Sequence, residues 1–597
     1  MKKNLLTFIP ALLLMFSISA QDNKWTTVFE ASGGLRTANY DDVIDFSKRL
    51  AEASPQVSYE VMGISAAGYE IPLVIINKKG LHTPEDVKAS GDVVLLVEAG
   101  IHPGEAEGTD AVLMLMRDIA ISGEKKQLLQ NVTFLFIPAF NVDGLNRFGP
   151  YHRINQNGPE QMGWRANSQN LNLNRDFLKA DTPAMRAWLK MFSRWLPDFF
   201  IDCHASDGAD YQYVITYVME TFGNMEPALS RWQEKEFLPW VQGQMDASGH
   251  LMFPYVSFRR WHDPESGLRS GVAPPRLSQG YTAIQNRPGL LIETHMLKPH
   301  KDRCLATYTL IDFTAQYLNR NAKKLQVMIA FADQLTASDA FRDRPFPISW
   351  KRDDSDSVMV EFKGVEYDTE DSDLTGGIWH RYHSDKPKTY TLPWYNRSIP
   401  DKMADLPEAY IIPLQYKDVI DRMALHGIEI KRLTKDMPVW VEQYRFKDPS
   451  WGRSPYEGRF TVNNIEYETF RDTVVYRKGS AVVDMNQRTA RVIANILEPG
   501  APDSYLSWGF FNAIFEQKEY SETYVMEGIA REMLGNDPDL RAEFEKKKTE
   551  DPEFSRSQWG MLNWFYSKTP WWDEKKNLYP VGKIIERHDL DGLPLKP

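Results

Sequence analysis

Two residue types that bind metal ions stand close together in the first quarter of the chain. His102 and Glu105 are separated only by Pro103-Gly104, a dipeptide that favours a tight turn. Such a turn would bring an imidazole nitrogen and a carboxylate oxygen to one ion, and zinc accepts both as ligands. His-x-x-Glu also arises by chance, however, and a surface turn followed by a helix-capping acid is the alternative interpretation.

A third candidate ligand, His204, comes shortly after the apolar residues Phe199-Phe200-Ile201. Asp202 lies two residues before it, on the same face if the segment is an extended strand, where it could orient the imidazole. A catalytic zinc needs three protein ligands and one open position, and His102, Glu105 and His204 would supply the three. A lone His at a strand end is more often structural, so the prediction depends on the combination.

The elements that must position these residues can be predicted from the hydrophobic pattern. Between residues 40 and 320, short apolar runs rich in β-branched and aromatic residues alternate with helical patterns. The alternation predicts an α/β fold with a mixed, mostly parallel open sheet flanked by helices. In such a sheet, ligands bind beyond the carboxyl ends of the strands. The apolar runs are 93–97, 132–138, 199–201 and 289–296, and the helical patterns are 109–121, 181–196 and 303–318.

Each of the four runs ends in, or contains, polar residues that could do chemistry. His102 and Glu105 follow the first run, Asn141-Val142-Asp143-Gly144 follows the second, and His204 follows the third. Glu293 lies within the fourth. Burying a carboxylate is costly, so Glu293 is either the partner of a Lys or Arg or a functional group.

The order of these residues resembles the zinc carboxypeptidase family, which includes the pancreatic carboxypeptidases A and B. That family has, in order, His-x-x-Glu, Asn-Pro-Asp-Gly, an Arg, Asn-Arg, a His and a catalytic Glu. The resemblance covers residues 27–319, about half of the chain, and Val142 replaces the Pro of the family's turn. The corresponding residues are His102, Glu105, Asn141-Val142-Asp143-Gly144, Arg165, Asn174-Arg175, His204 and Glu293.

The resemblance implies a zinc metallocarboxypeptidase that binds one Zn²⁺ per chain through His102, Glu105 and His204. It makes Glu293 the general base that takes a proton from water and passes it to the leaving amine. A group in that role typically contributes ~10²–10⁴-fold to the rate. The partner would be a peptide with a free C-terminus.

The resemblance also implies roles for three cleft residues. Arg165 would stabilise the oxyanion, and Asn174 and Arg175 would hold the terminal carboxylate of the substrate, for which the planar guanidinium is well suited. Taken alone, the two arginines would be interpreted as surface ion-pair residues. Tyr255 and Tyr281 are both candidates for the family's mobile active-site tyrosine, and the preferred terminal residue is not predicted.

Two other functions fit the same residues. A deacylase or amidase could use this scaffold on small acyl-amino acids or cell-wall peptides, and it would prefer short or modified substrates. An inactive peptide-binding protein could have kept the fold, and it would lack bound zinc.

The N-terminus has the pattern of a signal peptide. Lys2 and Lys3 precede an apolar stretch over residues 5–18, and small residues lead to Ala20 and the polar Gln21. We predict cleavage after Ala20 and a periplasmic or secreted protein. An uncleaved membrane anchor is the alternative. No later stretch is long and apolar enough to span a bilayer.

Bulk properties limit the remaining possibilities. The net charge is −11, which argues against nucleic acid as a partner. Cys203 and Cys304 are the only cysteines; they could form one disulfide but not a disulfide scaffold.

The length of 597 residues exceeds that of one ordinary domain. After the signal peptide at 1–20, we predict a catalytic domain over 21–340 and an α+β accessory region over 341–597. The accessory region is predicted to be strand-rich over 341–480 and helix-rich over 481–597. It could narrow the cleft, bind substrate or give structural support.

Overall fold

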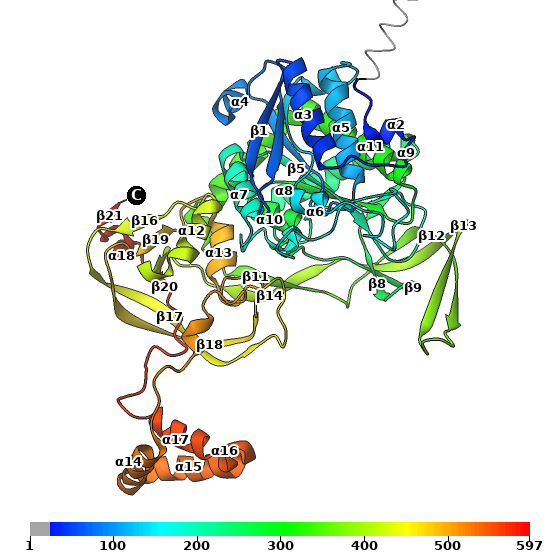
Figure 1. The fold of residues 1–597 in the computed structure, drawn as a ribbon. Coiled ribbons are helices and arrows are strands. Elements are labelled where there is room, and N and C mark those ends of the chain that lie inside the picture. The colour runs from blue at the N-terminus through cyan, green and yellow to red at the C-terminus, as the bar shows by residue number, and fades with distance from the viewer. Residues whose placement is uncertain (1–23, 597) are drawn as a thin grey trace, which may run out of the picture. The chain divides into compact units, whose positions relative to one another are not determined.

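The computed structural model of the chain describes residues 24–596, so the predicted signal peptide lies outside the described residues (Figure 1). The chain forms two compact units. The first runs to residue 407 and includes residues 416–431 and 483–504, and the second comprises the remaining C-terminal segments. The boundary predicted at residue 340 falls inside the first unit and stays a prediction about the extent of the catalytic domain.

An eight-stranded mixed sheet forms the centre of the first unit, with strand order β1-β2-β4-β3-β5-β10-β6-β7. The neighbours β4, β3, β5 and β10 are parallel, and β1, β2 and β6 join by antiparallel pairing. The four predicted strands are therefore confirmed, as is the mixed α/β class. The strands are β1 (Val57–Ile64), β2 (Glu70–Ile76), β3 (Val93–Glu98), β4 (Val132–Ile137), β5 (Phe199–Ser206), β6 (Ile215–Val218), β7 (Met252–Pro254) and β10 (Gly289–His295).

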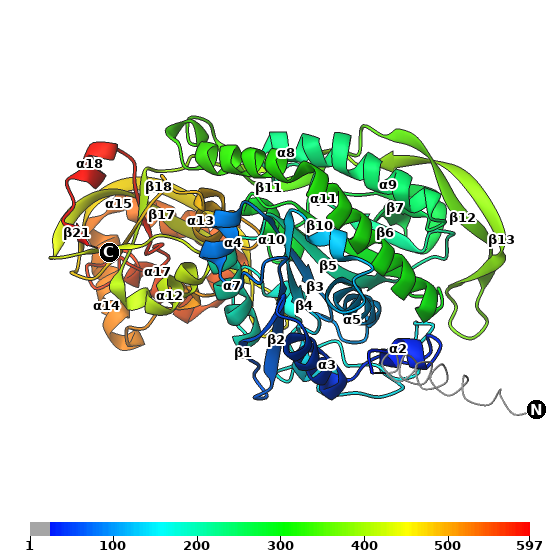
Figure 2. The ribbon, with the colours of Figure 1, turned by 90° about the horizontal axis from the view of Figure 1, so that it is seen from above.

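Helices flank the sheet (Figure 2). The helix α5 (Glu107–Ala120) packs between α3 (Tyr40–Ala53) and α11 (His300–Thr336). The helix α7 (Pro183–Trp195) begins as its sequence predicts, because Thr182 caps the amide of Met185 and Pro183 occupies the first turn. The helix α11 extends beyond the predicted residue 318, since no Gly or Pro interrupts it before Thr336.

The first unit also contains strands from the region after residue 340. A four-stranded sheet has the order β12-β13-β9-β8, and β11 pairs with β14. Its core includes Phe362, Leu392 and Leu268, so the two parts of the chain share one hydrophobic cluster. These strands are β8 (Ser257–Arg260), β9 (Asp263–Arg269), β11 (Phe346–Arg352), β12 (Val358–Asp371), β13 (Ile378–Tyr395) and β14 (Ser398–Ala404).

The second unit has an α+β composition. Its seven-stranded sheet includes β17 (Met437–Trp451) and β18 (Val462–Tyr476), which pair as a long hairpin. Helices between α14 (Thr523–Asn536) and α17 (Gln558–Tyr566) enclose a separate apolar cluster. Among the described residues, no helix combines the length and the hydropathy needed to cross a bilayer.

Candidate active site

A tight turn after β3 presents His102 and Glu105. The amide of Glu105 donates to the carbonyl of His102 at 2.8 Å, which closes the turn predicted from Pro103-Gly104. Gly100 enters this turn with φ at +69°, a conformation that glycine adopts without strain. His204 comes from β5, the neighbour of β3 in the sheet. Adjacent parallel strands therefore bring the three candidate ligands together.

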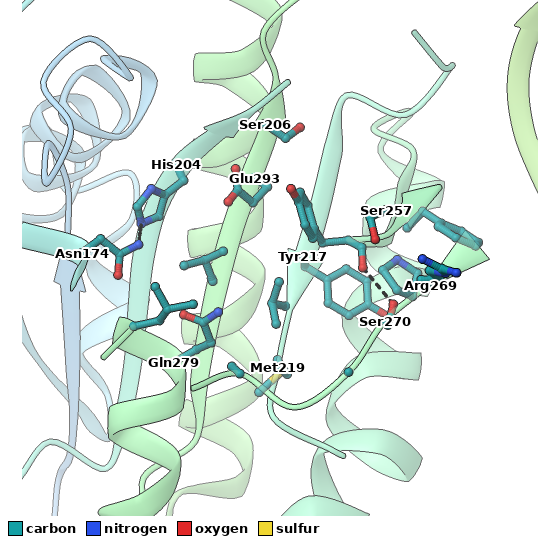
Figure 3. Close-up of a pocket in the computed structure, with 18 of the residues that line it drawn as sticks. Asn174, His204, Ser206, Tyr217, Met219, Ser257, Arg269, Ser270, Gln279 and Glu293 are labelled. Atoms are coloured by element: carbon teal, nitrogen blue, oxygen red, sulfur yellow. Dashed lines mark hydrogen bonds between the residues drawn. The ribbon is translucent and has the colours of Figure 1, made fainter. Parts of the chain in front are cut away.

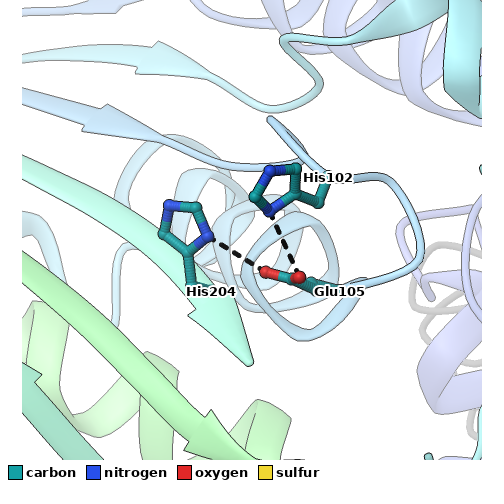
Figure 4. A group of neighbouring side chains, drawn as sticks. All are labelled: His102, Glu105 and His204. Carbon is teal, nitrogen blue, oxygen red and sulfur yellow. Dashed lines mark hydrogen bonds and ion pairs between the residues drawn. The ribbon is translucent and has the colours of Figure 1, made fainter. Parts of the chain in front are cut away.

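The three side chains form a compact ligand triangle (Figure 4). Glu105 Oε1 lies 3.2 Å from His102 Nδ1, and Glu105 Oε2 lies 3.0 Å from His204 Nδ1. In a tetrahedral zinc site with bonds near 2.0–2.2 Å, ligand atoms lie about 3.3 Å apart. All three side chains are buried. The donor set and its spacing therefore fit one zinc ion.

The far nitrogens of both histidines are fixed by acceptors. His204 Nε2 lies 2.7 Å from Asp202 Oδ2, and His102 Nε2 lies 2.8 Å from Asn172 Oδ1. Asn172 Oδ1 also accepts the amide of Asn174, which settles the orientation of its side chain. Each Nε2 therefore donates to its acceptor, which makes Nδ1 the nitrogen that faces the ligand triangle and would bind a metal. His102 Nδ1 is buried and faces Glu105 Oε1 at 3.2 Å, the carboxylate that would share the metal.

Positive charges surround the carboxylate of Glu105. Arg153 Nη1 and Arg165 Nη1 donate to its Oε1 at 2.8 and 3.0 Å. Burial alone would raise the pKa of Glu105, but His102 and Arg153 hold this pKa well below its usual range. Burial also lowers the pKa of His102 to about 4. Both groups are thus in the deprotonated form that metal ligation requires at neutral pH.

Glu293 lies directly opposite His204, since β10 and β5 are parallel neighbours in register. Removal from bulk water raises the pKa of Glu293 to about 8, and the negative charges of Glu105 and Asp202 add to the effect. A carboxylate with a pKa near the working pH can accept a proton and give it up again. The position beside the ligand triangle suits a general base.

Asn174 and Arg175 sit in a short helical turn next to His204. Ser278 donates its amide to Asn174 Oδ1 at 3.1 Å, and Arg175 Nη1 donates to the carbonyl of Asn174 at 2.7 Å. Both side chains line the same cavity as the ligand triangle. They are therefore available to a substrate group bound there.

All seven predicted site residues line one cavity of about 1310 Å³. Figure 3 labels three of them, Asn174, His204 and Glu293. Tyr255 also lines this cavity and lies close enough to Glu293 for the carboxylate to raise its pKa, although burial is the larger cause. Tyr281 is fully buried outside the lining, and its hydroxyl meets His426 Nδ1 at 2.9 Å. Of the two tyrosine candidates, Tyr255 is the one positioned to meet a substrate.

Several residues at the cavity belong to no motif that can be recognised in the sequence. Arg153 belongs to an irregular loop, and its contact with Glu105 is visible only in the folded chain. Trp350, Arg352 and Trp394 line the cavity from strands beyond residue 340. Within the first unit, part of the predicted accessory region thus borders the cleft. Cys203 and Cys304 are both buried and free, so the possible disulfide is not formed.

The chain is similar in sequence to known carboxypeptidases. The zinc carboxypeptidase family model matches residues 43–203. Carboxypeptidase 2 of Trichophyton rubrum is 22% identical over 505 residues, covering 80% of this chain and 85% of that protein. Carboxypeptidase 2 of Trichophyton equinum is 21% identical over 500 residues with the same coverage. A solved metallo-carboxypeptidase from Pseudomonas aeruginosa shares 17% identity, covering 48% of this chain and 70% of that one, with a TM-score of 0.36.

Residues 43–203 thus match the zinc carboxypeptidase family, and the relatives that align with most of the chain are carboxypeptidases, which supports a metallocarboxypeptidase as the resemblance predicted. The matched segment contains His102, Glu105, Arg165 and Asn174-Arg175. It ends one residue before His204.

Proposed function

We propose that the chain is an exported enzyme that hydrolyses the C-terminal peptide bond of peptides, with zinc held by His102, Glu105 and His204. The observation that carries the proposal is the placement of Glu293 opposite His204, beside the ligand triangle and in one cavity with Arg175. Bound zinc would polarise the scissile carbonyl and bring the pKa of a water down to about 7.

The protein's own residues supply the rest of the chemistry. Glu293 takes the proton of the attacking water and passes it to the leaving amine, which its raised pKa permits. Arg165 donates to the oxyanion as charge develops. Asn174 and Arg175 bind the free carboxylate at the end of the peptide, and this contact restricts cleavage to the last residue.

The test is the substitution Glu293→Gln. It keeps the size of the side chain but removes the base, so we expect normal zinc content and a fall in kcat of at least ~10²-fold. The matched control is Glu234→Gln, which removes another carboxylate from the cavity wall, one paired with Lys235 at 2.9 Å. The control should keep its activity. Turnover retained by Glu293→Gln would refute the general-base assignment.

A further inference from the structure

One wall of the cavity presents an arginine and a serine side by side. Arg269 on β9 and Ser257 on β8 are directly opposite each other in the antiparallel register, so their side chains share one face of the sheet. Both line the cavity. Arg269 Nε is buried without a hydrogen-bond partner, and within residues 24–596 no carboxylate forms a hydrogen bond or close ion pair with this guanidinium. The pKa of the exposed Asp354 is lowered mainly by its hydrogen bond from Arg352, and Arg269 adds to this only through its charge. The hydroxyl of Ser257 is likewise without a partner in that range.

The other basic side chains of the cavity are already engaged. An enclosed cation is costly unless an anion compensates it, and most of the cavity's cations have protein partners. Arg269 is the exception among the described basic residues of the cavity in having no hydrogen-bond partner, so a ligand group can supply one. The engaged contacts are Arg153 and Arg165 with Glu105, Lys351 with Asp401, Arg352 with Asp354, and Arg175 with the carbonyl of Asn174.

The wall that carries Arg269 is held in place by the neighbouring residue. Ser270 donates its hydroxyl to the carbonyl of Tyr255 at 3.0 Å and accepts from Trp394 Nε1 at 3.0 Å. Trp394 itself pairs in register with Leu268 of β9. The guanidinium therefore projects from a fixed strand rather than from a loose loop, which favours specific recognition.

Figure 3 shows Ser257, Arg269 and Ser270 grouped on the side of the cavity away from His204 and Glu293. Asn174, beside His204, belongs to the pair proposed to bind the terminal α-carboxylate. A substrate held at Asn174 and Arg175 would meet Arg269 through a second anionic group that reaches across the cavity.

We infer that Arg269, with Ser257, binds the side-chain carboxylate of the substrate's C-terminal residue, so the enzyme prefers peptides that end in Glu or Asp. The inference rests on the proposed function. A planar guanidinium matches a carboxylate with two parallel hydrogen bonds, and the hydroxyl of Ser257 can donate a third.

The test compares peptides that differ only in their last residue, Glu against the isosteric Gln, with zinc-loaded mature protein. We expect the wild type to favour the Glu-ended peptide by on the order of 10–100-fold in kcat/KM. Arg269→Gln should remove that preference and leave the Gln-ended peptide unchanged. The matched control is Arg259→Gln, since Arg259 on β8 lies outside the cavity lining and donates to the hydroxyl of Tyr395 at 3.0 Å. This control should retain the preference.

Three results would overturn the inference. Equal kcat/KM for the two peptides in the wild type would show that no acidic side chain is recognised. An equal loss for both peptides in Arg269→Gln would show that Arg269 binds the α-carboxylate or supports the fold. If the wild type shortens neither peptide, nor a mixture with other terminal residues, the proposed function fails and this inference fails with it.

Discussion

The two histidines of the ligand triangle are held by acceptors of different charge. His204 donates to the carboxylate of Asp202, which also accepts the hydroxyl of Ser278 at 2.6 Å, whereas His102 donates to the neutral amide of Asn172. A carboxylate behind a metal-bound imidazole raises the basicity of the ligand. The negative charge of Asp202 correspondingly raises the pKa of His204 well above its ordinary value, despite burial, which lowers it.

The substitution Asp202→Asn keeps an acceptor at this position but removes the charge. We therefore expect zinc affinity to fall by about 10–100-fold, measured by competition with a chelator of known affinity. Ser278→Ala is the control, because it removes a contact of Asp202 without removing the charge, and it should change the affinity less. An unchanged zinc affinity in Asp202→Asn would contradict the role assigned to this carboxylate.

At the scale of single residues, the sequence predicts contacts that follow from local geometry. Asp202 and His204 lie two positions apart on one strand, so strand periodicity predicts their proximity. Asn172 and Arg153 were not predicted, because they reach His102 and Glu105 across long stretches of irregular chain. The order of the candidate site residues can be found in a single sequence. The contacts that hold these residues in place depend on loop conformation, so they could not be predicted.

Among the elements, the loop after β6 is tied to the segment before α10 (Ser278–Ile284) by one buried carboxylate. Glu220 Oε1 accepts the amides of Phe222 and Gly223, and its Oε2 accepts the amide of Ala273. The indole ring of Trp350 occupies the space where a Cβ of Gly223 would lie. Phe222, Ala273 and Trp350 all line the cavity, so Glu220 holds together elements that shape it.

Glu220 should make stability depend on pH. Burial raises its pKa from an ordinary 4.5 to about 7, and the backbone hydrogen bonds offset only part of that rise. Between pH 4.5 and about pH 7, Glu220 is protonated in the folded state and ionised in the unfolded state. This group's stabilising contribution is therefore present below pH 4.5 and is lost as pH rises through 7.

As pH rises from 5 to 8, we expect the urea concentration at the unfolding midpoint to fall less steeply in Glu220→Gln than in the wild type. The variant should be less stable at low pH, because an amide cannot accept all of the backbone donors. Equal slopes in the two proteins would contradict the account of this carboxyl.

The sequence predicts the central strands better than the strands that border the cavity. The runs at 93–97, 132–138, 199–201 and 289–296 are continuous apolar segments, as expected for parallel strands covered on both faces, and each appears as β3, β4, β5 or β10. The parallel pairing of β13 with β9 joins Trp394 to Leu268. No local pattern encodes such a distant pairing, so the wall that carries Arg269 could not be predicted.

For the whole molecule, zinc should link parts of the first unit that are distant in sequence. The ligand triangle joins the turn after β3 to β5. A ligand that binds only the folded state stabilises it by about 4 kcal/mol at a thousand times its Kd.

Removing zinc with a chelator should therefore lower the melting temperature, and adding zinc back should restore it. His204→Ala is the control, since it lacks one ligand and its melting temperature should respond much less. The same melting temperature with and without metal in the wild type would contradict a zinc site that connects these elements.

The central claim, a zinc-dependent exopeptidase, is tested most directly by mass spectrometry of a peptide mixture incubated with purified mature protein of known zinc content. We predict one zinc per chain and products shortened one residue at a time from the C-terminus, with no shortening after chelation. One zinc per chain without such products would contradict the peptidase and favour a deacylase or amidase on the same scaffold. The absence of both zinc and shortened products would contradict an enzymatic function and favour a peptide-binding protein.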